Sequence, residues 1–343
     1  MLIAPPKSTV PPLALTSVLS GQWATIALFN AIELDVFAPI KDGQTTASAI
    51  AKKLKLDEKG VALILDGLVG MQVLEKKNEN YSLTDVAELY LLKSSPLFLG
   101  EFFEFGRGPG AEAWKSLGEV IRTGKPKQEV NKEETAEKFF PSLAAALFPL
   151  NYTTAAMVAD ELKIDKLPGA PRALDVAAGS AVWSIPMAEK CSSLKVDALD
   201  FPVVLKVAER FTKKYGVQDR YQYLSGDWRG VTLEPNSYDL VILGHILHSE
   251  GLSASKTLLD KLCKAMKAGG RIVIAEFMPN EHRTGPLFPL LFAINMYLQT
   301  SDGCVFSVAE LKNLLESYGF HEVKRLDLPY FKGESPVVIA TKK

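Results

Sequence analysis

Short apolar runs alternate with longer amphipathic segments from Arg172 to the end of the chain. The apolar runs include RALDVAA, LKVDALD, YDLVILG and RIVIAEF, whereas segments such as VVLKVAERFTKKYG and SKTLLDKLCKAMKAGG have helical spacing. Strands that alternate with helices predict an α/β fold with a mostly parallel, doubly wound sheet. Ser307 and Glu310 form a capping box at the start of the last helix, and two closing strands are expected around His321–Leu328 and Pro336–Thr341.

The first half of the chain is predicted to be mostly helical. A short helix is expected over Thr45–Leu54, capped by Thr45 or Thr46, and Asp57 can cap a second helix. A polar turn, EKKNEN, then leads into YSLT, which can close a small β-hairpin. Helix, helix and hairpin are the pattern of a winged helix.

The Pro/Gly-rich segment KLPGAPR lies between the mostly helical first half and the part in which strands alternate with helices. It suggests a domain boundary. We expect three parts: a winged-helix-like domain over 1–95, a helical linker over 96–167 and an α/β domain over 168–343. The linker carries many aromatic residues, which suit the wall of a substrate pocket.

Composition narrows the class of protein. The 343 residues are 47% hydrophobic and 23% charged, which excludes intrinsic disorder. Lys+Arg 39 against Asp+Glu 40 gives a net charge of -1, which argues against a dedicated nucleic-acid binder or a polybasic membrane binder. The three cysteines are far apart and form neither a disulfide framework nor a zinc signature, so they fit a reducing compartment.

Two uncharged stretches, Ser8–Ile32 and Thr284–Ser301, are long enough to be checked as membrane spans. Both contain prolines and polar amides, and neither begins as a signal peptide does. We predict a buried or interfacial helix in each, no membrane association and a cytoplasmic location.

Ligands of open α/β sheets bind at the carboxyl ends of the strands, and this sequence places small, acidic and aromatic residues there. The candidates at the ends of five successive strands are Asp175, Ala177 and Gly179; Asp200 and Phe201; Gly226, Asp227 and Trp228; Gly244, His245 and His248; and Glu276.

These residue types suit a nucleoside. Asp200, which lies 25 residues after Asp175, can bind a ribose diol. Asp227, next to the indole of Trp228, can hold an adenine. The phosphate-binding fingerprint G-x-G-x-x-G is absent, because Ala177, Ala178 and Ala181 stand where glycines would be expected, so a nucleoside without phosphates fits better. Each feature alone is also compatible with ordinary helix caps and loop residues.

The combination LDVAAGSA, Asp200-Phe201-Pro202, Gly226-Asp227-Trp228 and Ile246-Leu247-His248 resembles the class I S-adenosylmethionine (SAM) methyltransferases. It is most similar to the small-molecule O-methyltransferases that act on caffeic acid, hydroxyneurosporene and acetylserotonin. The resemblance covers nearly the whole chain and implies a Rossmann-like seven-stranded domain, SAM as methyl donor with S-adenosylhomocysteine as product, and a homodimer formed through the winged-helix domain.

The resemblance also implies roles for individual residues. Asp200 would bind the ribose, and Asp227 with Trp228 would hold the adenine. His248 would be the general base toward a hydroxyl, oriented by Glu276. The substrate contacts would come from Phe148, Tyr152, Phe292, Asn295 and Met296.

Three residues depart from the family pattern and bear on the base. Ser249-Glu250 replaces the usual Asp-Trp, and Val305 stands where a second supporting glutamate is expected. His245 and His248 could also form a metal pair, but no carboxylate cluster completes it in the sequence, so we expect no metal.

Three functions follow from this sequence. The first is O-methylation of an aromatic, polyketide-like or other small secondary metabolite. The second keeps the SAM pocket but catalyses hydroxylation, decarboxylation or pericyclic chemistry. The third is a winged-helix DNA-binding regulator, which is disfavoured because the helix that would read DNA is apolar and acidic.

Overall fold

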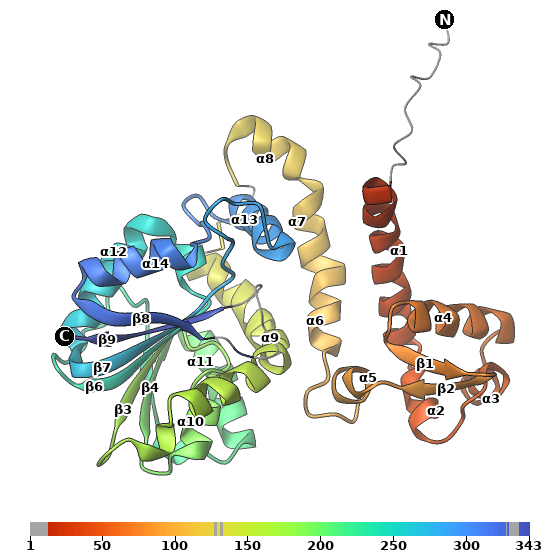
Figure 1. The fold of residues 1–343 in the computed structure, drawn as a ribbon, viewed down its shortest axis with the longest axis horizontal. Helices are drawn as coiled ribbons and strands as arrows, with labels where there is room; N and C mark the ends of the chain where they lie inside the picture. Colours follow the sequence, from red (N-terminus) through yellow and green to blue (C-terminus); the bar gives the residue numbers. More distant parts are fainter. Residues whose placement is uncertain (1–12, 127–128, 131–132, 327, 329–335) are drawn as a thin grey trace, which may run out of the picture. The chain divides into compact units, whose positions relative to one another are not determined.

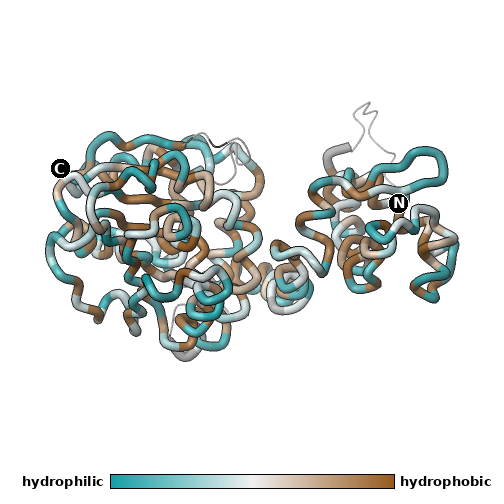
Figure 2. Tube along the Cα trace, turned by 90° about the horizontal axis from the view of Figure 1, so that it is seen from below, coloured by the Kyte–Doolittle hydropathy of each residue, from teal (hydrophilic) through white to brown (hydrophobic). Residues whose placement is uncertain are grey.

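The computed structural model describes residues 13–126, 129–130, 133–326, 328 and 336–343. The chain divides into two compact units, Met1–Phe103 and Glu104–Lys343. Figure 2 shows hydrophobic and hydrophilic segments along the chain in both units. The division assigns residues 104–167 to the second unit, together with the α/β domain.

The first unit is helical with one hairpin (Figure 1). It contains α1 (Leu13–Glu33), α2 (Phe37–Lys41), α3 (Ala47–Leu54), α4 (Glu58–Gly70), β1 (Leu74–Lys77), β2 (Asn80–Leu83) and α5 (Asp85–Tyr90). The predicted caps are confirmed, because the side chain of Thr46 accepts a hydrogen bond from the amide of Ala49 and that of Asp57 accepts one from Gly60. Strands β1 and β2 pair antiparallel, so the predicted helix, helix and hairpin are present.

Helix α1 exposes apolar side chains over most of its length. Trp23 and Val18 are each 75% exposed, and Leu15, Leu19 and Ile26 are also exposed, whereas burial begins near the end of the helix at Ala31 and Ile32. Water-exposed apolar surface of this extent is unusual on a monomer and indicates that another surface covers it.

The second unit begins within α6 (Gly100–Phe105) and contains the sheet. Its helices and strands are η1 (Gly106–Gly110), α7 (Ala111–Lys115), α8 (Leu117–Thr123), α9 (Glu133–Glu161), η2 (Ile164–Lys166), β3 (Arg172–Val176), α10 (Ile185–Lys190), β4 (Lys195–Asp200), α11 (Pro202–Lys214), η3 (Gln218–Arg220), β5 (Tyr221–Ser225), β6 (Tyr238–Gly244), α12 (Leu247–Ala265), β7 (Met266–Ala275), α13 (Leu287–Gln299), α14 (Val308–Ser317), β8 (Phe320–Leu326) and β9 (Val337–Lys342).

The seven strands of this unit lie in the order β5-β4-β3-β6-β7-β9-β8. Pairs among β3 to β7 are parallel, and β9 runs antiparallel to both β7 and β8. The chain moves outward in one direction through β4 and β5 and in the other through β6 and β7. The strand order therefore reverses between β3 and β6, and the crevice at their carboxyl ends is where such sheets bind ligands. The predicted α/β fold is confirmed.

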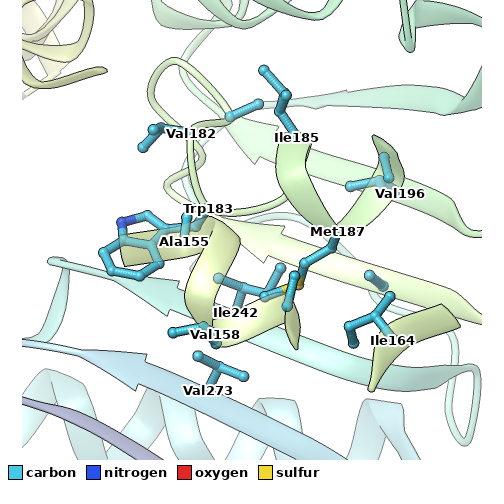
Figure 3. Close-up of a cluster of buried hydrophobic side chains, with 14 of the residues drawn as sticks. Ala155, Val158, Ile164, Val182, Trp183, Ile185, Met187, Val196, Ile242 and Val273 are labelled. Carbon is cyan, nitrogen blue, oxygen red and sulfur yellow. The ribbon is translucent and has the colours of Figure 1, made fainter. Parts of the chain in front are cut away.

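Helices cover both faces of the sheet, with α9, α10 and α11 on one face and α12 and α14 on the other (Figure 1). On the first face the side chains of Val158, Trp183 and Met187 pack against Ile242 and Val273 of the strands (Figure 3). The helices on both faces thus bury the sheet in the core of this unit.

One helix of the described residues, Thr135–Glu161, is long and apolar enough to cross a membrane by length and composition alone. It belongs to α9, and 44% of its apolar window is buried inside the chain. Its residues Phe148, Ala155 and Val158 are fully buried in the core beside the sheet. Packing against the sheet accounts for its apolar character.

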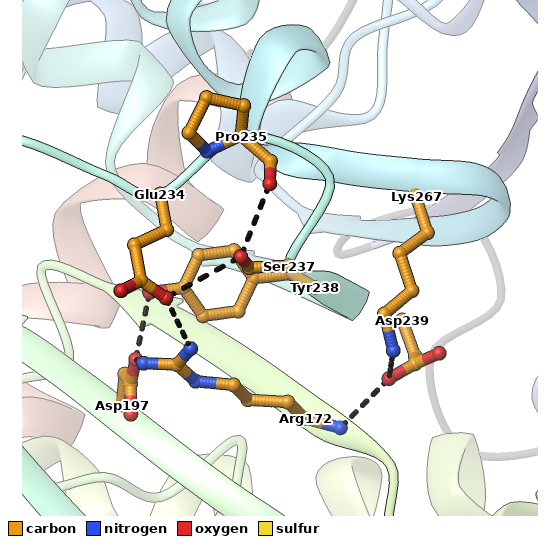
Figure 4. A network of polar contacts seen from close by, with 8 residues as sticks. All are labelled: Arg172, Asp197, Glu234, Pro235, Ser237, Tyr238, Asp239 and Lys267. Carbon is orange, nitrogen blue, oxygen red and sulfur yellow. Dashed lines mark hydrogen bonds and ion pairs between the residues drawn. The ribbon is translucent and has the colours of Figure 1, made fainter.

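A polar cluster ties together the amino-terminal ends of three strands, opposite the crevice (Figure 4). The guanidinium of Arg172 donates to Asp197 at 2.7 Å and to Glu234 at 3.0 Å, and its backbone amide donates to Asp239 at 2.9 Å. The hydroxyl of Tyr238 also donates to Asp197, at 2.7 Å. Because the nearly buried Asp197 carboxylate has two donors, its burial is compensated.

Candidate functional site

The loops after β3 and β4 meet at the Asp200 carboxylate. Its Oδ2 accepts a hydrogen bond from the amide of Gly179 at 2.8 Å, and its Oδ1 accepts one from the amide of Phe201 at 2.7 Å. Burial raises the pKa of Asp200 to about 6, although both amides act against the shift. A carboxylate has roughly four acceptor positions, so this side chain can still accept two further hydrogen bonds, as a ribose diol requires.

The loop after β3 turns sharply. Ala177, Gly179 and Ala181 adopt φ values of 52°, 58° and 57°, in the left-handed region. Two alanines therefore take conformations that glycine adopts without strain. The tight turn places the amide of Gly179 on Asp200.

Asp175 lies within β3 and not after it, as the sequence suggested. It is buried, and its Oδ2 accepts a hydrogen bond from the hydroxyl of Ser184 at 2.6 Å, while Tyr221 donates to that same hydroxyl at 3.0 Å. Burial raises the pKa of Asp175 to about 7. These contacts place Asp175 beneath the loop, where it supports the turn.

The loop after β5 lies beside that after β4, because the amide of Gly226 donates to the carbonyl of Asp200 at 3.0 Å. The carboxylate of Asp227 accepts from the backbone amide of Arg229 at 2.8 Å. The guanidinium of Arg229 lies over the ring of Trp228, 4.5 Å from its centroid. The acid and the indole that the sequence assigned to an adenine thus both contact Arg229.

Glu250, which departs from the family pattern, forms an ion pair with Arg229. Its side chain is only 8% exposed. Burial raises the pKa of Glu250, although Arg229 acts against the shift. The carboxylate thus holds Arg229 over Trp228 and ties the start of α12 to the loop after β5.

His248 and Glu276 form a buried pair. The imidazole Nδ1 lies 2.6 Å from Glu276 Oε2, and the backbone amide of His248 donates to Oε1 at 3.2 Å. Burial acts to raise the pKa of Glu276, but the nearby His248 and His245 imidazoles outweigh it, and the pKa lies below its usual range. An ionised Glu276 accepts the Nδ1 proton, which leaves the Nε2 lone pair free to take a proton from elsewhere.

The Cys304 amide donates to the carbonyl of His248 at 2.8 Å, so the loop before α14 packs on the beginning of α12. Val305, at the position of the second family glutamate, is buried. Among the described residues, Glu276 is the acid that hydrogen-bonds His248.

His245 lies at the end of β6, next to this pair. Its φ of 64° is in the left-handed region, and its amide donates to the carbonyl of Ala275 at 2.9 Å. The ring stacks on Phe277 with centroids 4.5 Å apart. Burial lowers the pKa of His245 to about 4. The preceding Gly244 is needed for packing, since a Cβ there would lie 2.2 Å from a ring atom of Trp183.

One nitrogen of His245, one of His248 and a Glu276 oxygen lie within 4.8 Å of one another. The sequence analysis found no carboxylate to complete the histidine pair, and the structure supplies Glu276. Two imidazoles and one carboxylate are a donor set that zinc or non-haem iron uses. Both oxygens of Glu276 already accept hydrogen bonds from His248, so a metal would have to displace them.

Aromatic rings line one side of the histidines. Phe292 meets His248 edge to face at 4.8 Å, and it lies 4.5 Å from Phe277, which in turn lies 4.9 Å from Phe288. The sequence analysis identified Phe292 but missed Phe277 and Phe288. The signal was available, because Phe277 directly follows Glu276 and Phe288 lies one helical turn before Phe292.

The structure places Phe148 and Tyr152, which the sequence analysis assigned to the substrate, in a different aromatic cluster. Phe148 is fully buried and stacks on Phe211 of α11 at 4.2 Å and on Tyr152 at 5.5 Å. The hydroxyl of Tyr152 donates to Glu189 at 2.8 Å. Both residues therefore pack α9 against α10 and α11, the alternative to substrate contact.

Asn295 and Met296 lie on α13, the helix that carries Phe292. The Oδ1 of Asn295 accepts hydrogen bonds from the indole of Trp114 at 3.2 Å and from Gln299 at 2.9 Å. Met296 is buried. Asn295 is thus bound to protein groups, and Phe292 is the member of this set that touches His248.

Comparisons with known proteins identify the family of this chain. The O-methyltransferase domain family matches residues 117–321, and the O-methyltransferase dimerisation domain family matches residues 16–93. The chain belongs to the O-methyltransferase family. Its α/β domain is therefore the Rossmann-like domain of a SAM-dependent methyltransferase, and its first unit is a dimerisation domain.

Individual relatives span nearly the whole chain of this family member. The 3-hydroxy-5-methyl-1-naphthoate 3-O-methyltransferase of Streptomyces sahachiroi is 27% identical over 324 residues, which cover 93% of this chain and 92% of that protein. A solved Nostoc punctiforme structure, described as a candidate O-methyltransferase, is 25% identical with a TM-score of 0.82 and covers 98% of this chain and 100% of its own. Human N-acetylserotonin methyltransferase, solved with SAM, shares the fold at 22% identity with a TM-score of 0.78, covering 99% of both chains.

Proposed function

We propose that this family member transfers methyl from SAM to a hydroxyl of an aromatic, polyketide-like or other small secondary metabolite. The observation that carries the proposal is the buried His248–Glu276 pair at the carboxyl end of the sheet, with its Nδ1 engaged at 2.6 Å. The same edge carries the Asp200 carboxylate at the end of β4.

The donor would lie across the ends of β3, β4, β5 and β6. The Asp200 carboxylate accepts hydrogen bonds from the ribose hydroxyls, and Asp227 and Trp228 hold the adenine. The backbone near Ala177 and Gly179 faces the methionine part. Phe201, Gly226, Gly244 and His245 complete that pocket, and Asp175 supports its floor through Ser184. When bound, SAM supplies a methyl group on a positively charged sulfur.

His248 would act as the general base. A phenolic hydroxyl is a weak nucleophile until its proton leaves, and the free Nε2 of His248 can take that proton. Glu276 fixes the tautomer through Nδ1 and stabilises the imidazolium that forms. Positioned general-base catalysis contributes about 10²–10⁴ in rate, and holding the hydroxyl in line with the methyl contributes much of the rest.

The acceptor would lie against Phe277, Phe288 and Phe292, whose rings favour a flat aromatic molecule. The Streptomyces relative acts on a hydroxynaphthoate, according to its name, which supports an aromatic hydroxyl as the methyl acceptor. Asn295 and Met296 lie on the same helix and remain candidates for the far end of this pocket.

The chain would work as a homodimer. The exposed apolar face of α1, with Trp23 and Val18 each 75% exposed, suits a second copy of the chain because the dimerisation family matches this segment. Covering that face removes a large apolar surface from water, and this is the main driving force of obligate homodimers.

The decisive experiment is single-turnover transfer of labelled methyl from SAM to naphthols. His248→Gln should keep the fold and the affinity for SAM but lose about 10²–10⁴ in rate, because Gln is similar in reach and cannot serve as the base. His282→Gln, at an exposed histidine far along the chain, is the matched control and should transfer at the parent rate.

A parent-like rate for His248→Gln across neutral pH would contradict a base role for His248. If the parent protein binds SAM but methylates no hydroxyl, the non-methylating reactions of the same pocket become the better hypothesis. The altered surroundings of His248, with Val305 in place of a second glutamate, are the feature that favours that alternative.

A further inference from the structure

The guanidinium of Arg229 is shared between two carboxylates. Its Nη2 pairs with Glu250 at the start of α12, and its Nη1 lies 3.2 Å from both oxygens of Asp227. Charge-assisted hydrogen bonds from a guanidinium to a carboxylate usually span about 2.7–2.9 Å. The side-chain contact with Asp227 is therefore long, and only one guanidinium nitrogen takes part in it.

This sharing leaves the Asp227 carboxylate with room for another donor. Its Oδ1 accepts hydrogen bonds from the backbone amide of Arg229 at 2.8 Å and from Nη1. Within the part of the chain that the structure describes, Oδ2 accepts from Nη1 alone. A carboxylate offers roughly four acceptor positions, and the Asp227 side chain is 37% exposed. A group that donates one hydrogen bond can therefore reach Oδ2 from solvent.

The charge of Glu250 maintains this arrangement. A guanidinium can present two parallel N–H groups to one carboxylate, and this bidentate pairing is its strongest contact. The Glu250 side chain is nearly buried, so Arg229, and not water, compensates its charge. Without that charge, Nη2 is free to turn toward Asp227, and a bidentate pair would then occupy both Asp227 oxygens.

The backbone of the same loop is anchored by a different residue. The Nζ of Lys261, on α12, donates to the carbonyl of Trp228 at 2.6 Å and to that of Arg229 at 3.3 Å. The loop is therefore held on α12 even when the Arg229 side chain moves. Glu250 accordingly determines where the guanidinium lies, while Lys261 holds the chain that carries it.

We propose that Glu250 is a positioning residue that holds one nitrogen of the Arg229 guanidinium away from Asp227 and so keeps the Asp227 carboxylate open to the amine of the donor's adenine. The inference rests on the proposed function, in which Asp227 meets that adenine. The amine donates a hydrogen bond to a charged acceptor, and a purine without it cannot do so. Glu250 thus selects for the purine amine without touching the ligand.

The experiment uses titration calorimetry at pH 8 on the full-length protein with two ligands. One is S-adenosylhomocysteine, and the other is its 6-deamino analogue, in which hydrogen replaces the adenine amine. The quantity measured is the ratio of the two affinities, which reports the contact with the amine because the ligands share the ribose and the homocysteine. The parent should favour S-adenosylhomocysteine by about tenfold or more, since the amine meets a charged acceptor.

Three variants test the role of Glu250. Glu250→Gln keeps the size of the side chain but removes its charge, so the ratio should fall to within about threefold of unity as Arg229 closes over Asp227. Combining it with Arg229→Met removes the competing guanidinium while methionine still packs on the Trp228 indole, and this double variant should regain the parental ratio. Glu250→Asp keeps the charge but is one methylene shorter; it should give an intermediate ratio, and it replaces Glu250→Gln as the test if that variant does not fold.

Asp260→Asn is the matched control. It removes the charge of an exposed ion pair with Lys264 on the same helix, and it should keep the parental ratio. A merely structural role of Glu250 would weaken the binding of both ligands equally. An unchanged ratio in Glu250→Gln, or a double variant that does not regain the parental ratio, therefore overturns the inference and leaves O-methylation standing.

The remaining outcomes separate the inference from the proposed function. If the ratio falls in Glu250→Gln and is regained in the double variant, but the parent methylates no hydroxyl, the role of Glu250 stands and O-methylation is wrong. A parent that binds the two ligands equally, or binds neither, overturns the inference.

Discussion

Removing the charge of Asp200 should weaken donor binding by an amount that depends on pH. In the structure each carboxylate oxygen accepts one backbone amide, from Gly179 at 2.8 Å or from Phe201 at 2.7 Å. A ribose diol would add two hydrogen bonds to a charged acceptor. Hydrogen bonds to charged groups contribute about 1.5–3 kcal/mol, so Asp200→Ala should weaken S-adenosylhomocysteine binding by about 10- to 150-fold near pH 8.

The pH dependence follows from the raised pKa. Burial raises the pKa of Asp200 to about 6, and the diol binds best to the ionised form. The parent should therefore lose about tenfold in affinity between pH 8 and pH 5, because only about one molecule in ten is ionised at the lower pH. Asp200→Asn keeps the shape, cannot ionise, and should bind weakly with no such step near pH 6.

As pH rises, ionisation of Asp200 strengthens donor binding but lowers the free energy of unfolding. Because the folded pKa lies above the unfolded value near 4, the protonated carboxyl favours the folded state at low pH. That contribution is full below about pH 4 and is lost as pH rises through about 6. The free energy of unfolding of Asp200→Asn should therefore show less loss over this interval than that of the parent.

Titration calorimetry between pH 5 and pH 8 measures the affinity, and thermal unfolding of the free protein measures the stability. Asp165→Asn, at an exposed residue of η2, is the matched control and should reproduce the parent in both. Equal affinities for Asp200→Asn and the parent at pH 8 would refute the contact with ribose. An affinity of the parent that is flat from pH 8 to pH 5 would refute the role of the raised pKa.

Four further outcomes are expected. Ala177→Gly should raise the free energy of unfolding by about 0.5–1 kcal/mol in denaturant titrations, since glycine removes left-handed strain of about 1–2 kcal/mol but adds freedom to the unfolded chain; Ala178→Gly, outside the left-handed region, should be destabilising, and equal effects would contradict this. Trp23→Asp should give a monomer in sedimentation experiments that report a dimer for the parent, because a charge enters the apolar face of α1; a persistent dimer would place the interface elsewhere. Glu276→Gln should slow single-turnover methyl transfer by about 10- to 100-fold, less than the loss at His248, because it orients the base and does not take the proton; a larger loss would reverse these roles. Exhaustive chelation should leave the parental rate unchanged, since both oxygens of Glu276 are occupied by His248; restoration of a lost rate by zinc would indicate a metal-dependent reaction.

Local patterns in the sequence predicted most of the fold. The helical spacing of apolar residues and the helix caps depend on residues that are close in the sequence. The helices capped by Thr46 and Asp57 and the capping box at Ser307 could therefore be predicted, and they are confirmed. The alternation of strands and helices along the chain was sufficient to predict the parallel part of the sheet. The ends of elements were less certain, and Asp175 lies inside its strand because the turn begins only at Ala177.

The sequence by itself also predicted where the candidate site lies, because strand order along the chain places Asp200, Asp227 and His248 at one edge of a parallel sheet. Side-chain packing between distant segments was decided only by the tertiary structure. It placed Phe148 in the core, brought Phe277 and Phe288 beside Phe292, and left the nitrogens of His245 buried without hydrogen-bond partners among the described residues. Spacing along one element predicts which face a residue occupies, whereas contacts across elements depend on how whole surfaces fit together.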